Sequence, residues 1–140
     1  MERSVSQTPQ FAPSAPAVLF VDPDVDTAQR LARSISHWAM TAVVPSVHGA
    51  MQAIRAHVPT IIVTELDLPD VHGFELIQRL HAEPATRRVL IMVTTRRTSI
   101  QDKVTAFQAG ADDFLVKPLD PKQFLLHLQL LTRFRSVTNG

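Results

Sequence analysis

Residues 59–76 read Pro59-Thr-Ile-Ile-Val-Thr-Glu65-Leu-Asp67-Leu-Pro69-Asp70-Val-His-Gly73-Phe-Glu-Leu. The run from 61 to 64 is apolar and β-branched, which predicts a strand buried on both faces. Glu65 and Asp67 follow at once, so two acids lie where this strand ends. In open α/β sheets, ligands bind beyond the carboxyl ends of the strands, which makes Glu65 a candidate site residue. The other reading is that Glu65 only solvates the end of a strand.

The composition bounds the class of protein. The chain has 140 residues, is 45% hydrophobic and has no cysteine, so we expect one domain of ordinary size without thiolate chemistry. Its net charge of +1 predicts no direct binding to nucleic acid. No apolar run approaches the ~20 residues of a membrane span, and the N-terminus lacks a signal-peptide core. We therefore expect a cytoplasmic protein.

Three segments are predicted along the chain. Residues 1–16 are polar, lack periodicity and carry Pro9, Pro13 and Pro16, which is typical of a disordered leader. Residues 17–135 carry the regular patterns and form the domain. Residues 136–140 are expected to be a C-terminal tail.

Within the domain, short apolar runs alternate with segments of helical periodicity. Strands are predicted at residues 17–21, 42–44, 61–64, 88–93 and 114–116. Helices are expected to begin after Asp24 or Asp26, Ser46, His72, Ser99 and Asp120, and the fourth should end at Gly110. Alternation of this kind predicts parallel strands joined by right-handed crossovers. The fold class is α/β, a doubly wound five-stranded parallel sheet with five helices, flavodoxin-like.

This sheet would bring four chemically active side chains to one edge. Asp22, Glu65, Thr94 and Lys117 each lie where a predicted strand ends. Because parallel strands end on the same edge, these residues should lie near one another. The sequence therefore predicts a pocket with two acids, a hydroxyl and an amine.

The domain resembles the receiver domains of two-component response regulators. The resemblance rests on several motifs in order: Val-Asp-x-Asp after the first strand, Glu-Leu-Asp-Leu-Pro-Asp-Val-His-Gly, Thr94 at a strand end, Ala109-Gly-Ala-Asp-Asp-Phe-Leu-Val-Lys-Pro118, and Asp120-Pro121 opening the last helix. It spans about 120 residues, from Ala17 to Arg135. It implies the same fold that the patterns predict.

The resemblance also implies chemical roles. Receivers accept a phosphoryl group on an aspartate at the end of the third strand, with Mg²⁺ held by two acids after the first strand and by the acceptor. A hydroxyl residue and a lysine then hold the phosphate. Asp22 matches the first metal acid, and Thr94 and Lys117 match the two phosphate-holding residues.

Two positions depart from that pattern. Glu65 stands where the acceptor aspartate is expected, and Pro23 stands where the second metal acid is expected. Proline offers no side-chain oxygen to a hard cation. The extra methylene of glutamate displaces the nucleophile, and a displacement of about 1 Å can cost roughly 10²-fold in rate. We therefore interpret the chain as a degenerate pseudo-receiver that needs no cofactor.

Some alternatives stay open at this pocket. Asp22, Asp24 and Glu65 could still gather a metal ion, and Asp67 could replace the acceptor, although solvated acids at a loop edge are the simpler reading. Glu65 could imitate the phosphorylated state by extending its charge toward Lys117 and Thr94. The simpler alternative is a plain ion pair between Glu65 and Lys117.

Outside the pocket, an aromatic residue, two arginines and the histidines are further candidates for a function. Phe114 falls at the position of the switching aromatic of receivers, and without a hydroxyl its ring is expected to turn inward. Arg96 and Arg97 are expected in a solvated loop. The six histidines show no metal-ligand spacing.

The last helix carries two apolar stripes. Phe124, Leu125, Leu128 and Leu131 form the stripe expected to pack on the sheet, whereas Leu126, Leu130 and Phe134 form a second stripe. A partly exposed apolar stripe is typical of an interface. In receivers the fourth helix, fifth strand and fifth helix form the association surface, which implies a protein partner or a homodimer here. The alternative is packing of the leader, or continuation into a linker helix.

The sequence is compatible with three functions. The first is a phosphorylation-independent signalling and interaction module, which is the function we predict. The second is an atypical receiver that still works as a phosphoacceptor with Mg²⁺ and regulates an output. The third is an independent enzyme, for which the sequence offers neither a nucleophile-base pair nor a glycine-rich phosphate loop.

Overall fold

A computed structural model describes residues 15–139, with side chains described to Phe134. The prediction for the leader concerns residues that lie almost wholly outside this range. The ten elements are, in chain order, β1 Ala17–Val21, α1 Val25–Ser34, β2 Met40–Val44, α2 Val47–Ala56, β3 Ile61–Thr64, α3 Gly73–Ala82, β4 Leu90–Thr95, α4 Ile100–Ala109, β5 Asp113–Val116 and α5 Pro121–Asn139.

The five strands form one parallel sheet in the order β2-β1-β3-β4-β5. Strands β3 and β4 are buried along their whole length, in keeping with their unbroken apolar sequences. The register aligns Val21 with Thr64 and Thr64 with Val93, so the carboxyl ends of the central strands lie side by side. The predicted fold class is confirmed.

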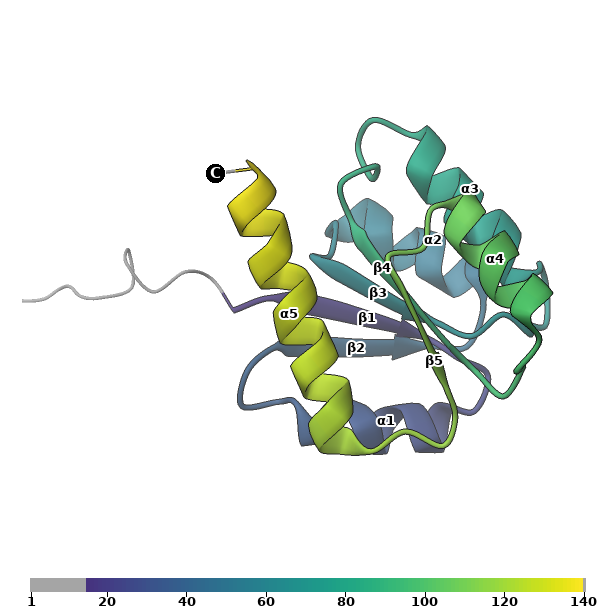
Figure 1. Ribbon diagram of the computed structural model, residues 1–140. Coiled ribbons are helices and arrows are strands. Elements are labelled where there is room, and N and C mark those ends of the chain that lie inside the picture. The colour runs from purple at the N-terminus through teal and green to yellow at the C-terminus, as the bar shows by residue number, and fades with distance from the viewer. Residues whose placement is uncertain (1–14, 140) are drawn as a thin grey trace, which may run out of the picture.

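Helices cover both faces of the sheet, as Figure 1 shows. Buried side chains of α2, α3 and α4 pack on one face in a core that includes Ile54, Leu76 and Leu80. Buried side chains of α1 and α5 pack on the other face, where the rings of Phe20 and Phe124 lie 5.9 Å apart. The sheet is therefore the middle layer of three.

Side chains cap several helices at the predicted positions. Asp24, Ser46 and Ser99 accept hydrogen bonds from the backbone N–H three residues later. Asp120 does the same for the N–H of Gln123 at 3.0 Å. These bonds satisfy N–H groups that a helix cannot satisfy within itself. Gly110 ends α4 with a φ of 126°, in the left-handed region that favours glycine.

Several boundaries differ from the predictions. Strand β4 begins at Leu90 rather than at Arg88, because a turn precedes it in which the N–H of Val89 donates to the carbonyl of Thr86. It continues to Thr95, whose carbonyl accepts from Lys117 N. Strand β2 begins two residues earlier than predicted, and α5 runs to Asn139, beyond the expected end of the domain at Arg135.

The loop after β3 is tied to two helices. Both carboxylate oxygens of Asp70 accept hydrogen bonds from the first N–H groups of α2, those of Val47 and His48. Hydrogen bonds from these N–H groups lower the pKa of Asp70, with that of His48 contributing most. Gly73 opens α3 so close to the end of β3 that its N–H donates to Leu66 O at 2.9 Å.

Candidate functional site

The predicted pocket forms at the carboxyl edge of the sheet. It has a volume of about 560 Å³, and its lining includes Asp22, Pro23, Glu65, Thr94 and Lys117. Strand β1 ends just before Asp22, β3 just before Glu65 and β5 just before Lys117, while Thr94 lies within β4. The structure thus brings together the four side chains that the topology predicted.

Lys117 forms the centre of the pocket's polar network. Its ammonium donates to Asp22 Oδ2 at 2.7 Å and to Glu65 Oε1 at 2.9 Å. Both acids are buried, with exposed fractions of 6% and 7%. Burial of Lys117 disfavours its charge, but its hydrogen bonds to the two carboxylates outweigh that penalty and raise its pKa. One internal cation therefore serves two buried acids.

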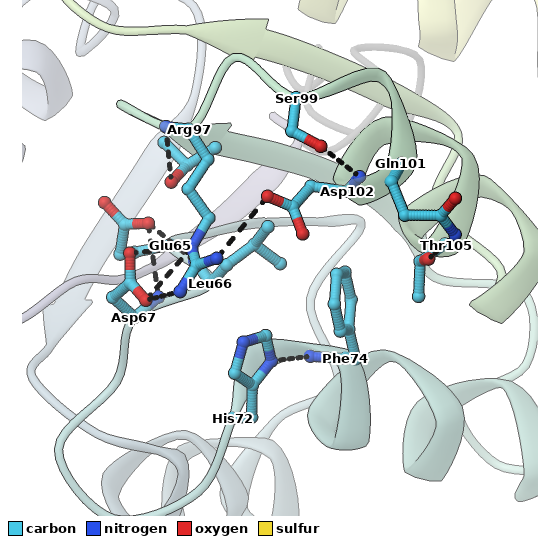
Figure 2. Close-up of polar contacts among 11 residues, drawn as sticks. Glu65, Leu66, Asp67, His72, Phe74, Arg97, Ser99, Gln101, Asp102 and Thr105 are labelled. Atoms are coloured by element: carbon cyan, nitrogen blue, oxygen red, sulfur yellow. Dashed lines mark hydrogen bonds and ion pairs between the residues drawn. The ribbon is translucent and has the colours of Figure 1, made fainter.

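The second oxygen of Glu65 turns back onto the main chain. Glu65 Oε2 accepts from Leu66 N at 2.7 Å and from Asp67 N at 3.3 Å, as Figure 2 shows. The longer glutamate arm lets the carboxylate reach these two N–H groups while its other oxygen meets Lys117. Both oxygens are consequently occupied by donors of the same chain.

The acids of the segment after β1 take part in local hydrogen bonds that lead into helix α1. Asp22 Oδ1 accepts from Asp24 N at 2.9 Å, and Asp24 caps α1. The hydrogen bond to Thr27 lowers the pKa of Asp24. Among residues 15–139, no group of three or more His, Cys, Asp or Glu side chains is arranged to hold a metal ion.

Asp67 belongs to a second network, drawn in Figure 2. The guanidinium of Arg97 meets both carboxylate oxygens of Asp67, with Nη2 at 2.6 Å from Oδ1, and Nη1 lies 3.4 Å from Asp102 Oδ2. The hydrogen bond from Arg97 lowers the pKa of Asp67, and the same contact raises that of Arg97. Arg97 lies in an exposed loop, as predicted, and its guanidinium there joins the β3–α3 loop, the β4–α4 loop and α4.

Two further predicted residues are buried. Thr94 is 3% exposed and lines the pocket. The Phe114 ring is buried in the core beneath α4, as expected from its lack of a hydroxyl, and Lys103 Nζ lies 5.7 Å from the ring centroid.

Sequence reasoning missed the roles of Arg97, Asp102 and Lys103. The contact between Arg97 and Asp67 had one signal in the sequence, which was position. Asp67 follows closely on β3 and Arg97 on β4, and these two strands are neighbours in the sheet. Asp102 lies in the first turn of α4, where it faces the same loop. Arg96 and Arg97 carry the same charge, so charge alone could not predict which of the two contacts Asp67.

The predicted association surface is apolar and exposed. On α5, Leu126, Leu130 and Phe134 are exposed, with 71% for Phe134. On α4, Ile100, Val104 and Phe107 repeat at helical spacing and are also exposed, and Val116 lies at the end of β5. In Figure 1, β5 lies between α4 and α5. The stripe on α4 was not predicted individually, although the helix was named as part of the surface.

Comparison with known proteins agrees with the fold. The family described as the response regulator receiver domain matches residues 18–129. The DNA-binding dual master transcriptional regulator RpaA of Synechocystis is 30% identical over 120 residues, which are 84% of this chain and 49% of that protein. The transcriptional regulatory protein PhoP of Escherichia coli is 36% identical over 83 residues, covering 59% of this chain and 36% of its own.

A solved structure shows the same fold. The CheY-like response regulator receiver domain protein of Methanospirillum hungatei has a TM-score of 0.83 at 20% identity, covering 91% of this chain and all of that one. The chain belongs to the response regulator receiver domain family of two-component signalling. It spans about half or less of the length of the two curated regulators above.

Proposed function

We propose that this chain is a receiver-type signalling module that works without phosphorylation, by binding a protein partner or a second copy of itself. The supporting observation is the double ion pair of Lys117 with Asp22 and Glu65. It neutralises much of the charge of the acid pair inside the chain. A phosphoacceptor cycle would instead require a carboxylate that is free to attack a phosphoryl group.

The donor set does not fit a divalent cation. Pro23 provides no side-chain oxygen, whereas Mg²⁺ requires near-octahedral coordination by oxygen ligands, which are carboxylates and waters. The Lys117 ammonium lies within 2.9 Å of both buried acids, and a metal ion bound there would meet a positive charge. We therefore propose that the module uses no Mg²⁺.

Glu65 acts as a structural ion-pair partner in this proposal, rather than as an imitation of a phosphorylated residue. Its two oxygens are engaged by Lys117 and by the N–H groups of Leu66 and Asp67. No hydrogen bond joins Glu65 to Thr94 in the part of the chain that the structure describes. A phosphoryl group offers more acceptor oxygens and more charge than a carboxylate.

The partner surface proposed is the one formed by α4, β5 and α5, where the exposed apolar side chains gather. Partner binding there requires neither an enzyme activity nor direct contact with nucleic acid, and neither is part of the proposal. No helix within residues 15–139 is long and apolar enough to cross a bilayer. We place the module in the cytoplasm, as proposed from the sequence.

Magnesium titration followed by backbone NMR tests the proposal. We expect no saturable shifts confined to Asp22, Glu65 and Asp67 at millimolar Mg²⁺, and no mass increase of one phosphoryl group with a small acyl phosphate donor. Saturable shifts, or that mass increase, would favour an atypical but working phosphoacceptor.

The matched variant restores both missing features at once. Pro23→Asp with Glu65→Asp returns a metal acid and shortens the acceptor, so it should recover measurable Mg²⁺ binding. Recovery in the double variant, with none in the parent chain, would assign the loss of metal binding to these two positions.

A further inference from the structure

Strand β2 forms an open edge of the sheet, on the side opposite to β5. Figure 1 shows β2 beside β1, and β2 pairs with no other strand among the described residues. Natural proteins usually protect such an edge with charges, prolines or bulges. The sequence of β2, Met-Thr-Ala-Val-Val, has none of these. Met40 is 62% exposed, and Thr41 and Ala42 are exposed as well.

The hydrogen-bond pattern identifies which backbone groups face outward. Met40 N donates to Pro16 O, and Val44 O accepts from Asp22 N, so Met40 and Val44 are bonded to β1. In a parallel ladder, alternate residues bond to the same neighbour. Ala42 therefore also faces β1, whereas the N–H and C=O groups of Thr41 and Val43 point to the open edge.

Hollows flank β2 on both faces of the sheet. One, of about 150 Å³, is lined by residues that include Met40, Ala53 and His57 on the α2 side. The other, also about 150 Å³, is lined by residues that include Ala32, Arg33 and Val43 on the α1 side. The side chains of an added strand alternate between the two faces, so this edge has room for both sets.

We propose that β2 pairs with β2 of a second copy in antiparallel orientation, centred on Ala42, to form a continuous ten-stranded sheet. This register places Thr41 opposite Val43 of the second copy, and both residues direct their backbone groups outward. Four hydrogen bonds result, on either side of the Ala42 pair. The contact extends beyond the proposed function and uses a different surface from α5.

The side chains are complementary in the same register. Met40 meets Val44 on the α2 side, the two Ala42 residues meet each other, and Thr41 meets Val43 on the α1 side. Apolar and β-branched pairs stabilise antiparallel strands, and no like charges within the strand face one another. The contact is nevertheless small for a protein interface, so we expect a weak, concentration-dependent dimer.

Disulfide capture tests the register, because the chain has no cysteine of its own. Directly opposed residues of a non-hydrogen-bonded pair have Cα atoms about 4.5 Å apart, within the range that a disulfide spans. Ala42→Cys should therefore give a covalent dimer on mild oxidation. Thr41→Cys is the matched control, since its two copies lie roughly 8 Å apart and should give much less dimer.

Sedimentation equilibrium provides a second, independent measurement. Thr41→Pro removes an outward N–H without removing a bond to β1, so it should weaken self-association through this edge by about tenfold or more, or about 1.4 kcal/mol. Both measurements are repeated in chains carrying Leu126→Glu with Leu130→Glu, which isolates the β2 edge from the α5 surface. The Ala42→Cys dimer should persist in that background.

Several outcomes would overturn the proposal. One is equal capture of Ala42→Cys and Thr41→Cys, and another is a monomeric Ala42→Cys chain after oxidation at high concentration. If the Ala42→Cys dimer no longer forms in the Leu126→Glu, Leu130→Glu background, the dimer contact lies on α5. The NMR signals of Thr41 and Val43 distinguish a further case. If they shift when a polyglutamate peptide is added, but not when the chain concentration is raised, the edge binds an acidic partner beside Arg33 and not a second copy.

Discussion

Lys117 is the residue on which the electrostatics of the pocket depend. Its ammonium lies between the buried carboxylates of Asp22 and Glu65, which would otherwise repel each other at close range. Removing one partner from a buried charge network leaves uncompensated charge, which costs more than the network contributes as a whole. The ammonium therefore stabilises the fold as well as shaping the site.

Lys117→Met should lower the free energy of unfolding by about 3 kcal/mol at neutral pH, because Asp22 and Glu65 then remain buried without their cation. The control is Lys103→Met on α4, where an exposed cation over an aromatic ring contributes only about 0.5–1 kcal/mol. Urea unfolding of both variants measures the difference. Equal losses in the two variants would contradict a special role for Lys117.

The pH dependence of the same variant follows from the direction of the pKa shift. The pKa of Lys117 is raised in the folded chain, so its stabilisation is fully present below the unfolded value of about 10.4. That stabilisation is lost as the pH rises through the folded pKa. On the alkaline side, the stability gap between parent and Lys117→Met should therefore close in strongly alkaline solution, and a gap that closed near pH 8 would disprove the assignment.

At the scale of elements, the junction of β3 and α3 positions Glu65. Gly73 opens α3, and a Cβ atom at this position would lie 2.7 Å from the carbonyl oxygen of Glu65 and 2.7 Å from Leu66 Cα. These neighbours are backbone atoms, which cannot move aside as a flexible side chain can. Because Gly73 has no side chain, the start of α3 can lie this close to the end of β3.

Gly73→Ala should destabilise the fold by about 1–3 kcal/mol, the usual cost of overpacking, and shift the NMR signals of Glu65 and Leu66. The control is Gly49→Ala in α2, where the added methyl group would lie 3.2 Å from the Val44 side chain. Alanine also favours a helix over glycine by up to about 1 kcal/mol, which offsets that contact. Thermal unfolding compares the two; a Gly73→Ala chain as stable as Gly49→Ala would contradict the close approach.

The elements themselves were largely predictable from the sequence. Apolar runs, helical periodicity and capping residues depend on local chemistry, and Ser46, Ser99 and Asp120 cap helices where the sequence placed them. The start of β4 was not predictable, because Val89 is buried in the turn before the strand and reads like a strand residue. A single apolar residue reports burial, not backbone conformation.

The site was predictable only in part, because its contacts depend on more than the local sequence. Topology placed Asp22, Glu65, Thr94 and Lys117 together, since strand ends meet whatever their side chains. Which acid the lysine contacts depends on side-chain rotamers, so the second ion pair, to Asp22, could not be inferred. Arg97 and Asp67 lie in two different loops. The relative positions of loops cannot be predicted from the periodicity of apolar residues, so this contact could not be predicted.

At the scale of the whole molecule, the pocket and the association surface are linked by β4, β5 and α4. Thr94 lines the pocket, and it pairs in register with Leu115 of β5. Arg97 connects the β3–α3 loop to Asp102 at the start of α4. Contacts within the chain therefore run from the pocket to the exposed apolar side chains of α4 and β5.

The last prediction concerns that surface. Leu126 and Leu130 are 53% and 46% exposed on α5, while Phe124 and Leu128 of the same helix are fully buried in the core. Leu126→Glu with Leu130→Glu adds charge only to the exposed stripe, so the fold should persist with a loss of at most about 1 kcal/mol. Burying two uncompensated carboxylates in an apolar interface is costly, so association through α5 should weaken by at least about tenfold.

Sedimentation and partner capture measure the association, and thermal unfolding monitors the fold. The control replaces exposed polar residues of the same helix, Lys122→Gln with Gln123→Glu, which changes the net charge by the same −2 near the N-terminus of α5 without touching the apolar stripe. If the control weakens association as much as the leucine variant, charge rather than apolar contact governs binding. If neither variant changes association, α5 is not part of the surface, and the partner binds elsewhere on the sheet or its helices.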